Sequence, residues 1–433
     1  MRKSTLLSAA LCAVLTFGAA SCSHETLPTF NAKAMDDLLK GAIADGQTLG
    51  VTALVFDEGQ TVYHGAFGVR DRERELPMDY DTVFRLYSMT KPITSVLILQ
   101  LAEEGKLSLD DAAAKYIPQL SQMKVASLGA DGKPKFDAQT TPMTVRDLML
   151  HRSGMGYGIF GDINSVETAW GKADLFNGDE DLSVKMDKLA RLPLLGQPGE
   201  GWYYSFSTDV LGRIAEVVTG EELDDLFDAR IFTPLGMDST GFTVRSDQVS
   251  DFATAYQTAG GGVFGIQDDA VTSDFLKDNA YHSGGGGLVG TLGDYARFCR
   301  AMLDGGALDG KRILPEAVAF SMMEDQLDAD DKYLFPADKG GAVRFGYGGG
   351  VVVKNDPKLK FEHGLSPGQW GWGGAAKTKF WIDRPNKAFA IIMMQQLQRD
   401  DPVLHKDFRA LVWNQTRNEG AADLPLPAPS AAE

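Results

Sequence analysis

The chain has 433 residues, enough for one or two domains with a large core. Hydrophobic residues make up 44% and charged residues 23% of it, as in ordinary soluble globular proteins. The formal net charge is −17 at pH 7, so non-specific binding of nucleic acid is not expected, because the negatively charged phosphate backbone would be repelled.

Residues 1–21 predict a secretory signal peptide, because a basic start leads into a mostly apolar run, 6–17, and then into small residues. Cys22 follows directly, as in a bacterial lipoprotein cleavage site. Lipid anchoring through Cys22 and plain secretion both stay open. We therefore expect an exported bacterial protein, in the periplasm or tethered to a membrane, with residues 22–30 as the tether.

Three cysteines are present, at positions 12, 22 and 299. After removal of the signal and use of Cys22, only Cys299 remains in the folded body, so no internal disulfide is expected there. Cys299 lies in a helical pattern and is predicted to be a small buried side chain.

The folded body begins with a helix predicted over 31–45, which Gly46 ends. Two strand-like runs joined by a turn at 57–60 then predict a hairpin. Further along, helices are predicted over 144–151, 180–192, 209–219, 221–232, 292–303 and 315–323, and strands over 345–353, 375–382 and 388–394.

Early strands, a helical middle and late strands predict one sheet built from both ends of the chain. We expect an α/β (α+β) fold in which a mainly antiparallel sheet is flanked by helices. Residues 31–111 and 275–418 would form this discontinuous domain, and 112–274 an inserted, mainly helical one. The tail over 419–433 is rich in Ala and Pro and is predicted to be disordered.

Ser88 and Lys91 form an S-x-x-K pair at the start of an apolar run, 93–101, that predicts a buried helix. Three residues make nearly one helical turn, so the hydroxyl and the amine lie side by side. Pro92 must lie in the first turn, where its missing N–H is tolerated. A serine there is a candidate nucleophile with its own base, and an ordinary helix cap is the alternative.

A lysine acts as a base near neutral pH only if its pKa is lowered and a partner moves the proton. Tyr203 and Tyr204 are candidate partners, because both lie on a loop just before the predicted helix over 209–219. A tyrosine packed beneath the loop is the alternative for either.

Trp372, Gly373 and Gly374 lead into the strand predicted from Ala375. Glycines allow a ligand to approach the backbone closely, and a free strand N–H can bind an oxyanion. An ordinary turn or bulge is the alternative.

With these three motifs in this order, the sequence resembles the class C β-lactamase-like and penicillin-binding-protein-like serine hydrolases, closest in style to the family VIII carboxylesterases. The resemblance implies the two-domain serine β-lactamase-like fold and runs from about residue 35 to 415. Supporting blocks lie at 143–148, 151–154 and 283–288.

The resemblance implies that Ser88 attacks an acyl carbonyl while Lys91 and Tyr204 share the base and acid work. The backbone N–H groups of Ser88 and of Ala375, on an edge strand, would hold the oxyanion. Tyr203 is a weaker rival of Tyr204. The implied substrate-binding residues are Tyr203, Phe206, Trp372, Gly373 and Gly374.

Two departures from the family pattern bear on the substrate. Phe206 stands where an asparagine would bind a β-lactam amide, and Trp372 stands where a lysine would meet a substrate carboxylate. Both changes remove polar recognition, which favours uncharged esters of small to medium acyl groups. The expected partner is thus a small-molecule ester, with weak β-lactam turnover still possible, and neither cofactor nor metal is expected.

Three further motifs are interpreted as decoys. Ser121 and Lys124 form a second S-x-x-K in a loop, and Ser366 lies in a G-x-S-x-G without the strand and helix that such an elbow needs. Residues 377–379 resemble a K-T-G motif without the glycine and are predicted to be a solvated strand edge.

Two alternatives to an esterase stay open. A β-lactamase or DD-peptidase acting on cell-wall-type amides would use the same residues. A catalytically silent binding module at the cell envelope is the other, although the joint presence of Ser88, Lys91 and Tyr204 argues against it.

Overall fold

The computed structural model describes residues 30–128, 134–159, 165–258, 261–327, 332–333, 343–353, 364–398 and 401–416. The signal region, Cys22 and the tail over 419–433 lie outside the described residues, so the predictions made for them stay predictions.

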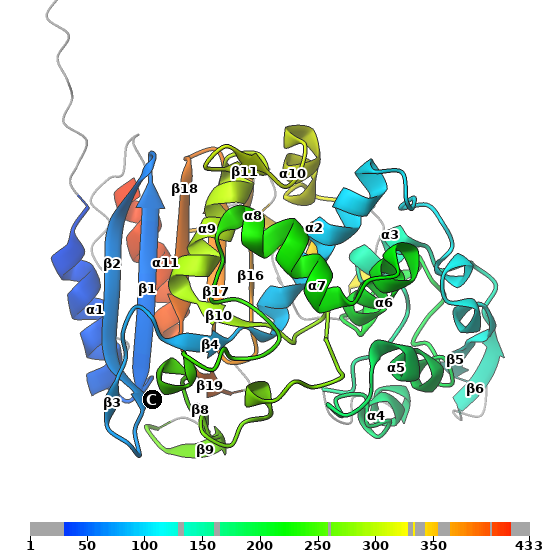
Figure 1. The fold of residues 1–433 in the computed structure, drawn as a ribbon, viewed down its shortest axis with the longest axis horizontal. Helices are drawn as coiled ribbons and strands as arrows, with labels where there is room; N and C mark the ends of the chain where they lie inside the picture. The colour runs from blue at the N-terminus through cyan, green and yellow to red at the C-terminus, as the bar shows by residue number, and fades with distance from the viewer. Residues whose placement is uncertain are drawn as a thin grey trace, which may run out of the picture.

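An antiparallel sheet of eight strands in the described part combines the two ends of the chain (Figure 1). The early and late strands meet where β1 (Gly50–Asp57) pairs with β18 (Ala388–Met393), with Leu54 opposite Ile391. In spatial order the strands are β14 (Val343–Phe345), β15 (Val351–Val353), β16 (Gln369–Gly373), β17 (Lys379–Asp383), β18 (Ala388–Met393), β1 (Gly50–Asp57), β2 (Gln60–Asp71) and β3 (Leu76–Pro77).

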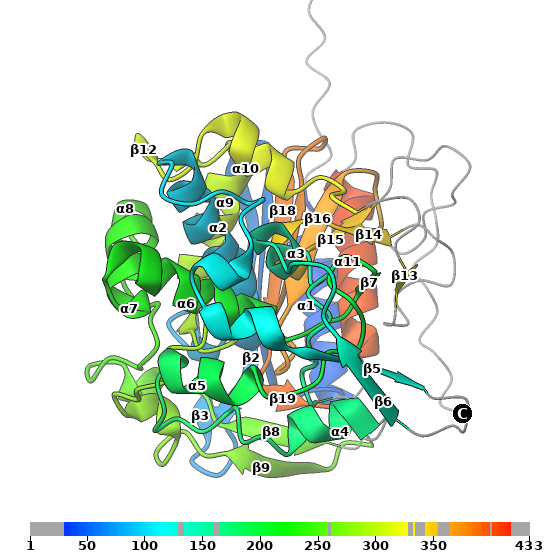
Figure 2. The ribbon, with the colours of Figure 1, turned by 90° about the vertical axis from the view of Figure 1, so that its right-hand side faces the viewer.

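Both faces of this sheet are covered by helices. Every residue of β18 is buried, and alternate side chains enter two different cores because successive strand residues point to opposite faces. On one face lie α1 (Ala32–Ala44) and α11 (Val403–Thr416). On the other lie α2 (Thr90–Glu103) and α9 (Leu292–Leu303), as Figure 2 shows.

The remaining helices pack beside the face that carries α2, where α6 lies directly against α2 (Figures 1 and 2). They are α3 (Val145–Met149), α4 (Ser165–Gly171), α5 (Leu182–Leu189), α6 (Ser207–Thr219), α7 (Leu223–Phe227), the π-helical turn η4 (Asp228–Phe232), α8 (Thr233–Leu235) and α10 (Glu316–Met322).

Small strand pairs complete the described part. They are β4 (Val83–Arg85) with β10 (Val289–Thr291), β5 (Lys124–Leu128) with β6 (Pro134–Ala138), β7 (Gly201–Trp202) with β13 (Lys332–Tyr333), β11 (Ala307–Leu308) with β12 (Lys311–Arg312), and β8 (Ala255–Thr258) with β9 (Phe264–Asp268) and β19 (Gln396–Leu397). Several lie within 112–274, so that segment is less purely helical than its sequence predicts.

Several local predictions are confirmed. Helix α1 lies inside the predicted range, and the Asn31 side chain caps it by accepting a hydrogen bond from the Ala34 amide at 3.0 Å. The hairpin turn between β1 and β2 is made by Glu58 and Gly59, both at positive φ, as a two-residue turn requires. Helix α9 has the predicted bounds.

The predicted C-terminal strands need two corrections. The run over 345–353 is interrupted by the tight turn η7 (Tyr347–Gly349), where Gly348 and Gly349 take positive φ and separate β14 from β15. The strand predicted from Ala375 begins instead at Lys379, after a turn, and β16 was not predicted. Glycines obscure both boundaries because they carry no side-chain alternation.

Candidate active site

Ser88 lies in the 3₁₀ turn η1 (Tyr87–Met89) between β4 and α2. The preceding Tyr87 has a φ of 44°, which is rare for a bulky side chain and marks a backbone held in place by its surroundings. Helix α2 begins at Thr90, so Pro92 falls in the first turn as predicted. The local sequence thus places a serine at the entrance of a buried helix.

Lys91 is fully buried and directs its ammonium at the nucleophile. Its Nζ donates to the Ser88 Oγ at 3.2 Å, to the Tyr157 hydroxyl at 3.2 Å and to the Gly285 carbonyl at 2.6 Å. Three acceptors match the three hydrogens of an ammonium group.

Burial by itself lowers the pKa of Lys91, but the phenolic oxygens of Tyr157 and Tyr204 outweigh it and raise that pKa above its ordinary value. Lys91 therefore stays charged. The sequence-based requirement of a neutral lysine is not met, because three acceptors surround the nitrogen and stabilise its protonated form.

Tyr204 completes the contact around the nucleophile. Its hydroxyl oxygen lies 2.6 Å from the Ser88 Oγ, and Lys91 Nζ lies 4.6 Å from the centre of its ring. The ring is held by aromatic neighbours, with centroids 4.8 Å from His151 and 5.5 Å from Trp372. The structure thus brings together Ser88, Lys91 and Tyr204, which lie in separate parts of the sequence.

Tyr157 is a site residue that the sequence analysis missed. It is buried, contacts Lys91 and packs edge-on against Tyr204 at 5.2 Å. Burial raises its pKa above the ordinary value, so the phenol stays neutral. In the sequence, Tyr157 could have been found from its position three residues after the block at 151–154, within the same loop.

The turn after β16 faces the nucleophile. Gly374 lies so close to the Leu86 carbonyl that a Cβ there would meet the oxygen at 2.3 Å. Ala375 follows as an exposed turn residue, and in the described part of the chain its amide donates to no main-chain carbonyl. The predicted edge strand is therefore wrong, because β16 lies between β15 and β17 and Ala375 belongs to the turn beyond it.

Two cavities meet at Ser88, and both are also lined by Ile159 and Ala375. The first, called the sheet arm here, has a volume of about 390 Å³ and includes Tyr204, Phe345, Val351, Trp372, Gly373 and Gly374 in its lining. The second, called the helical arm, has a volume of about 420 Å³ and includes Tyr87, Tyr157, Phe176, Phe242, Phe275 and Tyr281.

Two predicted substrate-binding residues line neither arm. Tyr203 turns its hydroxyl toward Gly196, where a Cβ would meet it at 2.4 Å. Phe206 is buried behind Tyr157, with ring centroids 4.9 Å apart. Phe206 thus shapes the cleft through Tyr157, because the first turn of α6 directs its ring into the core.

The motifs interpreted as decoys lie away from the nucleophile. Ser366 is buried and its hydroxyl donates to the Asp383 carboxylate, while Ser121 is exposed and donates to a neighbouring carbonyl. The solvated edge predicted for 377–379 is wrong in part. Lys377 and Thr378 are buried, because the turn after β16 folds against the start of α11.

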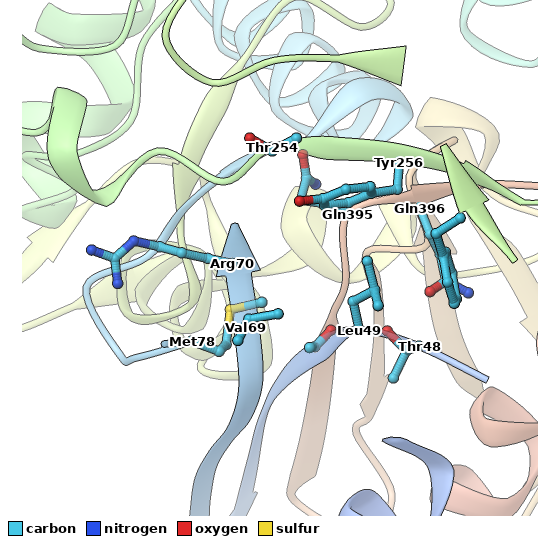
Figure 3. Close-up of a pocket in the computed structure, with 11 residues that line it drawn as sticks. Thr48, Leu49, Val69, Arg70, Met78, Thr254, Tyr256, Gln395 and Gln396 are labelled. Carbon is cyan, nitrogen blue, oxygen red and sulfur yellow. Dashed lines mark hydrogen bonds between the residues drawn. The ribbon is translucent and has the colours of Figure 1, made fainter. Parts of the chain in front are cut away.

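A third cavity, which Ser88 does not line, is shown in Figure 3 between Arg70, Thr254 and Tyr256. Its volume of about 10 Å³ is at most that of one water molecule, so it is not a substrate site. Within the described ranges no group of three His, Cys, Asp or Glu side chains is placed to hold a metal ion, and no helix is long and apolar enough to cross a membrane.

The serine, lysine and tyrosine thus meet between the antiparallel sheet and the helical region. The Beta-lactamase family model matches residues 35–412 of the chain. The chain belongs to the beta-lactamase family. It is a serine hydrolase of this family, with Ser88 at the site that the fold builds.

Two relatives in this family are named esterases. Esterase EstB from Burkholderia gladioli is 30% identical over 371 residues, which cover 82% of this chain and 87% of EstB. Lovastatin esterase from Penicillium rubens is 28% identical over 393 residues, which cover 87% of this chain and 96% of that enzyme.

Solved structures share the fold. EstCE1, described as a hydrolase with promiscuous acyltransferase activity, has a TM-score of 0.75 and 26% identity, covering 88% of this chain and 98% of EstCE1. Simvastatin synthase (LovD) from Aspergillus terreus has a TM-score of 0.75 at 23% identity, covering 90% of this chain and 99% of LovD, and shows the fold alone.

Proposed function

We propose that this serine hydrolase cleaves uncharged carboxylic esters of small to medium acyl groups through an acyl-enzyme on Ser88. The observation that carries the proposal is the contact of Ser88 with both Tyr204 and Lys91 at the point where two largely apolar arms meet. The esterases among the relatives support the ester class.

In the proposed reaction, the active Lys91–Tyr204 pair carries an ammonium and a phenolate. The phenolate oxygen takes the proton of Ser88 as its Oγ attacks the ester carbonyl. The ammonium beside it offsets the negative charge that Tyr204 carries before the transfer. The base role thus belongs to Tyr204, because the raised pKa of Lys91 keeps its own proton in place.

The tetrahedral oxyanion is held by the amides of Ser88 and Ala375. Its collapse breaks the bond to the alcohol oxygen, which receives the proton from Tyr204. Water then attacks the acyl-enzyme carbonyl and gives a proton to Tyr204. The bond between the acyl carbon and Ser88 Oγ breaks, Oγ takes that proton back from Tyr204, and the carboxylic acid leaves. Each cycle consumes one ester and one water and returns Ser88 to its starting state.

The arms divide the substrate between them. Tyr204 lines the sheet arm but not the helical arm, so the leaving alcohol, which needs its proton, lies in the sheet arm. The acyl group then occupies the helical arm, whose walls carry Tyr87, Phe242 and Phe275. This orientation favours apolar or aromatic acyl groups.

We expect a neutral short-chain p-nitrophenyl ester to be a better substrate than a cephalosporin, measured as kcat/KM. Trp372 supplies apolar surface where a cation would meet a carboxylate, so Trp372→Lys should raise the relative kcat/KM for a carboxylate-bearing ester by roughly tenfold. Ser88→Ala serves as the blank. A wild-type preference for the cephalosporin would instead support the β-lactamase or peptidase alternative, and absence of any turnover the silent module.

We also propose that the chain is exported and tethered through Cys22. The support is the sequence alone: a signal-like start over 1–21 and a cysteine directly after small residues. The mass of the mature N-terminal peptide should include a lipid on Cys22, and Cys22→Ser should release the protein from the membrane fraction. A peptide that begins elsewhere without lipid would support plain secretion.

A further inference from the structure

Asp209 is a buried carboxylate in the first turn of α6, five residues after Tyr204, and it lines neither arm of the cleft. One of its oxygens, Oδ1, accepts hydrogen bonds from the Tyr281 hydroxyl at 2.8 Å, the Ser283 hydroxyl at 2.6 Å and the Gly285 amide at 3.3 Å. The carboxylate therefore fastens the loop over residues 281–285 to α6.

The second oxygen, Oδ2, is buried and has no hydrogen-bond partner in the described structure. It lies directly against Gly285, where a Cβ would meet it at 2.3 Å. An asparagine amide oxygen could accept the same three hydrogen bonds and hold the loop equally well. A carboxylate with one buried, unpartnered oxygen is costlier to bury than an amide, so the presence of Asp at position 209 points to a role for its negative charge.

Gly285 connects this charge to the catalytic lysine. Its carbonyl accepts the shortest hydrogen bond that Lys91 makes, at 2.6 Å, while its amide is bound by Asp209. The Asp209 carboxylate, which binds the amide of the same glycine, stabilises the ammonium through its field and does not line the substrate cleft. The field of Asp209 also contributes to raising the pKa of Lys91, after the two tyrosines.

We propose that Asp209 is a positioning residue for catalysis, which holds the Gly285 carbonyl on Lys91 and keeps the lysine charged beside Tyr204. The inference rests on the proposed function. The loop before α6 carries Tyr204, and the first turn of α6 carries the carboxylate that fixes the Gly285 carbonyl on Lys91.

Other ionisable groups face these two residues. Tyr157, Tyr204 and His151 lie around Lys91, and burial together with the lysine lowers the pKa of His151 well below its ordinary value, so this imidazole stays neutral. Tyr281 faces Asp209. On the Tyr281 ring lies the Lys185 ammonium, 4.6 Å from the ring centroid, and this ammonium pairs with the Glu180 carboxylate at 3.4 Å. Among the groups identified by these contacts, Asp209 is the carboxylate whose field acts on Lys91.

The test replaces the charge and keeps the shape with Asp209→Asn. We expect kcat to fall about tenfold or more with KM nearly unchanged, because Asp209 does not contact the substrate. Removing a negative charge lowers the pKa of Lys91, so the fall of kcat/KM at alkaline pH should move to lower pH by roughly one unit or more. Kinetics are normalised to sites titrated with a fluorophosphonate, so misfolded protein does not count.

Glu216→Gln is the matched control, since Glu216 is a buried acid of the same helix that pairs with Arg213 at 3.0 Å, away from Lys91. It should change thermal stability but neither kcat nor the pH profile. Asp209→Ser repeats the loss of charge should the asparagine variant fail to fold. Wild-type kcat and pH profile in either Asp209 variant would overturn the inference, whereas a wild-type protein without ester turnover or labelling would overturn the proposed function instead.

Discussion

Replacing Ser88 with alanine is expected to abolish ester turnover, with a loss of at least about 10⁴-fold in kcat. Oγ is the atom that bonds to the acyl carbon in the proposed mechanism, and it lies within hydrogen-bond distance of both Tyr204 and Lys91. No side chain left in place can take over that bond. The measurement is steady-state hydrolysis of a p-nitrophenyl ester together with mass spectrometry of fluorophosphonate-treated protein.

The adduct should map to Ser88 in the wild-type protein and disappear in Ser88→Ala. Ser366→Ala is the control, because this serine sits in a competing nucleophile motif. It should keep full labelling while losing about 1 kcal/mol of stability with the hydrogen bond to Asp383. An adduct on Ser366, or turnover that survives in Ser88→Ala, would contradict the assignment of the nucleophile.

Replacing Tyr204 with phenylalanine should lower kcat by about 10²- to 10⁴-fold, the range of a lost general acid–base group. The ring would remain packed against His151 and Trp372, so the change removes the hydroxyl at 2.6 Å from Ser88 and little else. Tyr203→Phe is the matched control, because its hydroxyl points toward Gly196, outside the cleft. It should leave kcat unchanged.

The pH dependence tests the charge assigned to Lys91. The proposed mechanism needs the Lys91 ammonium beside Tyr204, so loss of that proton sets the alkaline limit of wild-type kcat/KM. The raised pKa of Lys91 keeps the ammonium present into alkaline pH, so activity should persist there. A fall of wild-type kcat/KM already near neutral pH on the alkaline side would contradict the charge assigned to Lys91.

Much of the fold follows from local patterns in the sequence. The apolar spacing of α1 and the cap at Asn31 depend only on neighbours within a few residues, as does the turn at Glu58 and Gly59. The late strands were harder, because glycines at 346, 348, 349 and 350 break β14 from β15 and glycines at 371, 373 and 374 conceal β16. Glycine carries no side chain from which a period of two could be recognised.

For the site, the sequence by itself determined the local pair: a serine and a lysine one turn apart, with Pro92 marking the helix start. It also offered Tyr203 and Tyr204 as candidate partners of the lysine, and the family resemblance favoured Tyr204. The residues by themselves did not show which of the two side chains enters the cleft, or that Phe206 packs behind Tyr157 and not against substrate. Those directions depend on how the loop before α6 lies against distant segments.

Only the tertiary structure decided the charge state of Lys91. Two of its acceptors come from Tyr157 and Gly285, 66 and 194 residues away along the chain. The Asp209 carboxylate binds the amide of that same Gly285 and acts on the lysine through its field. The pKa of a buried group is set by whichever polar atoms packing brings within a few ångströms. Sequence spacing sets distances along one helix turn, whereas electrostatic interactions act through space. The protonation state of Lys91 therefore depends on the tertiary fold.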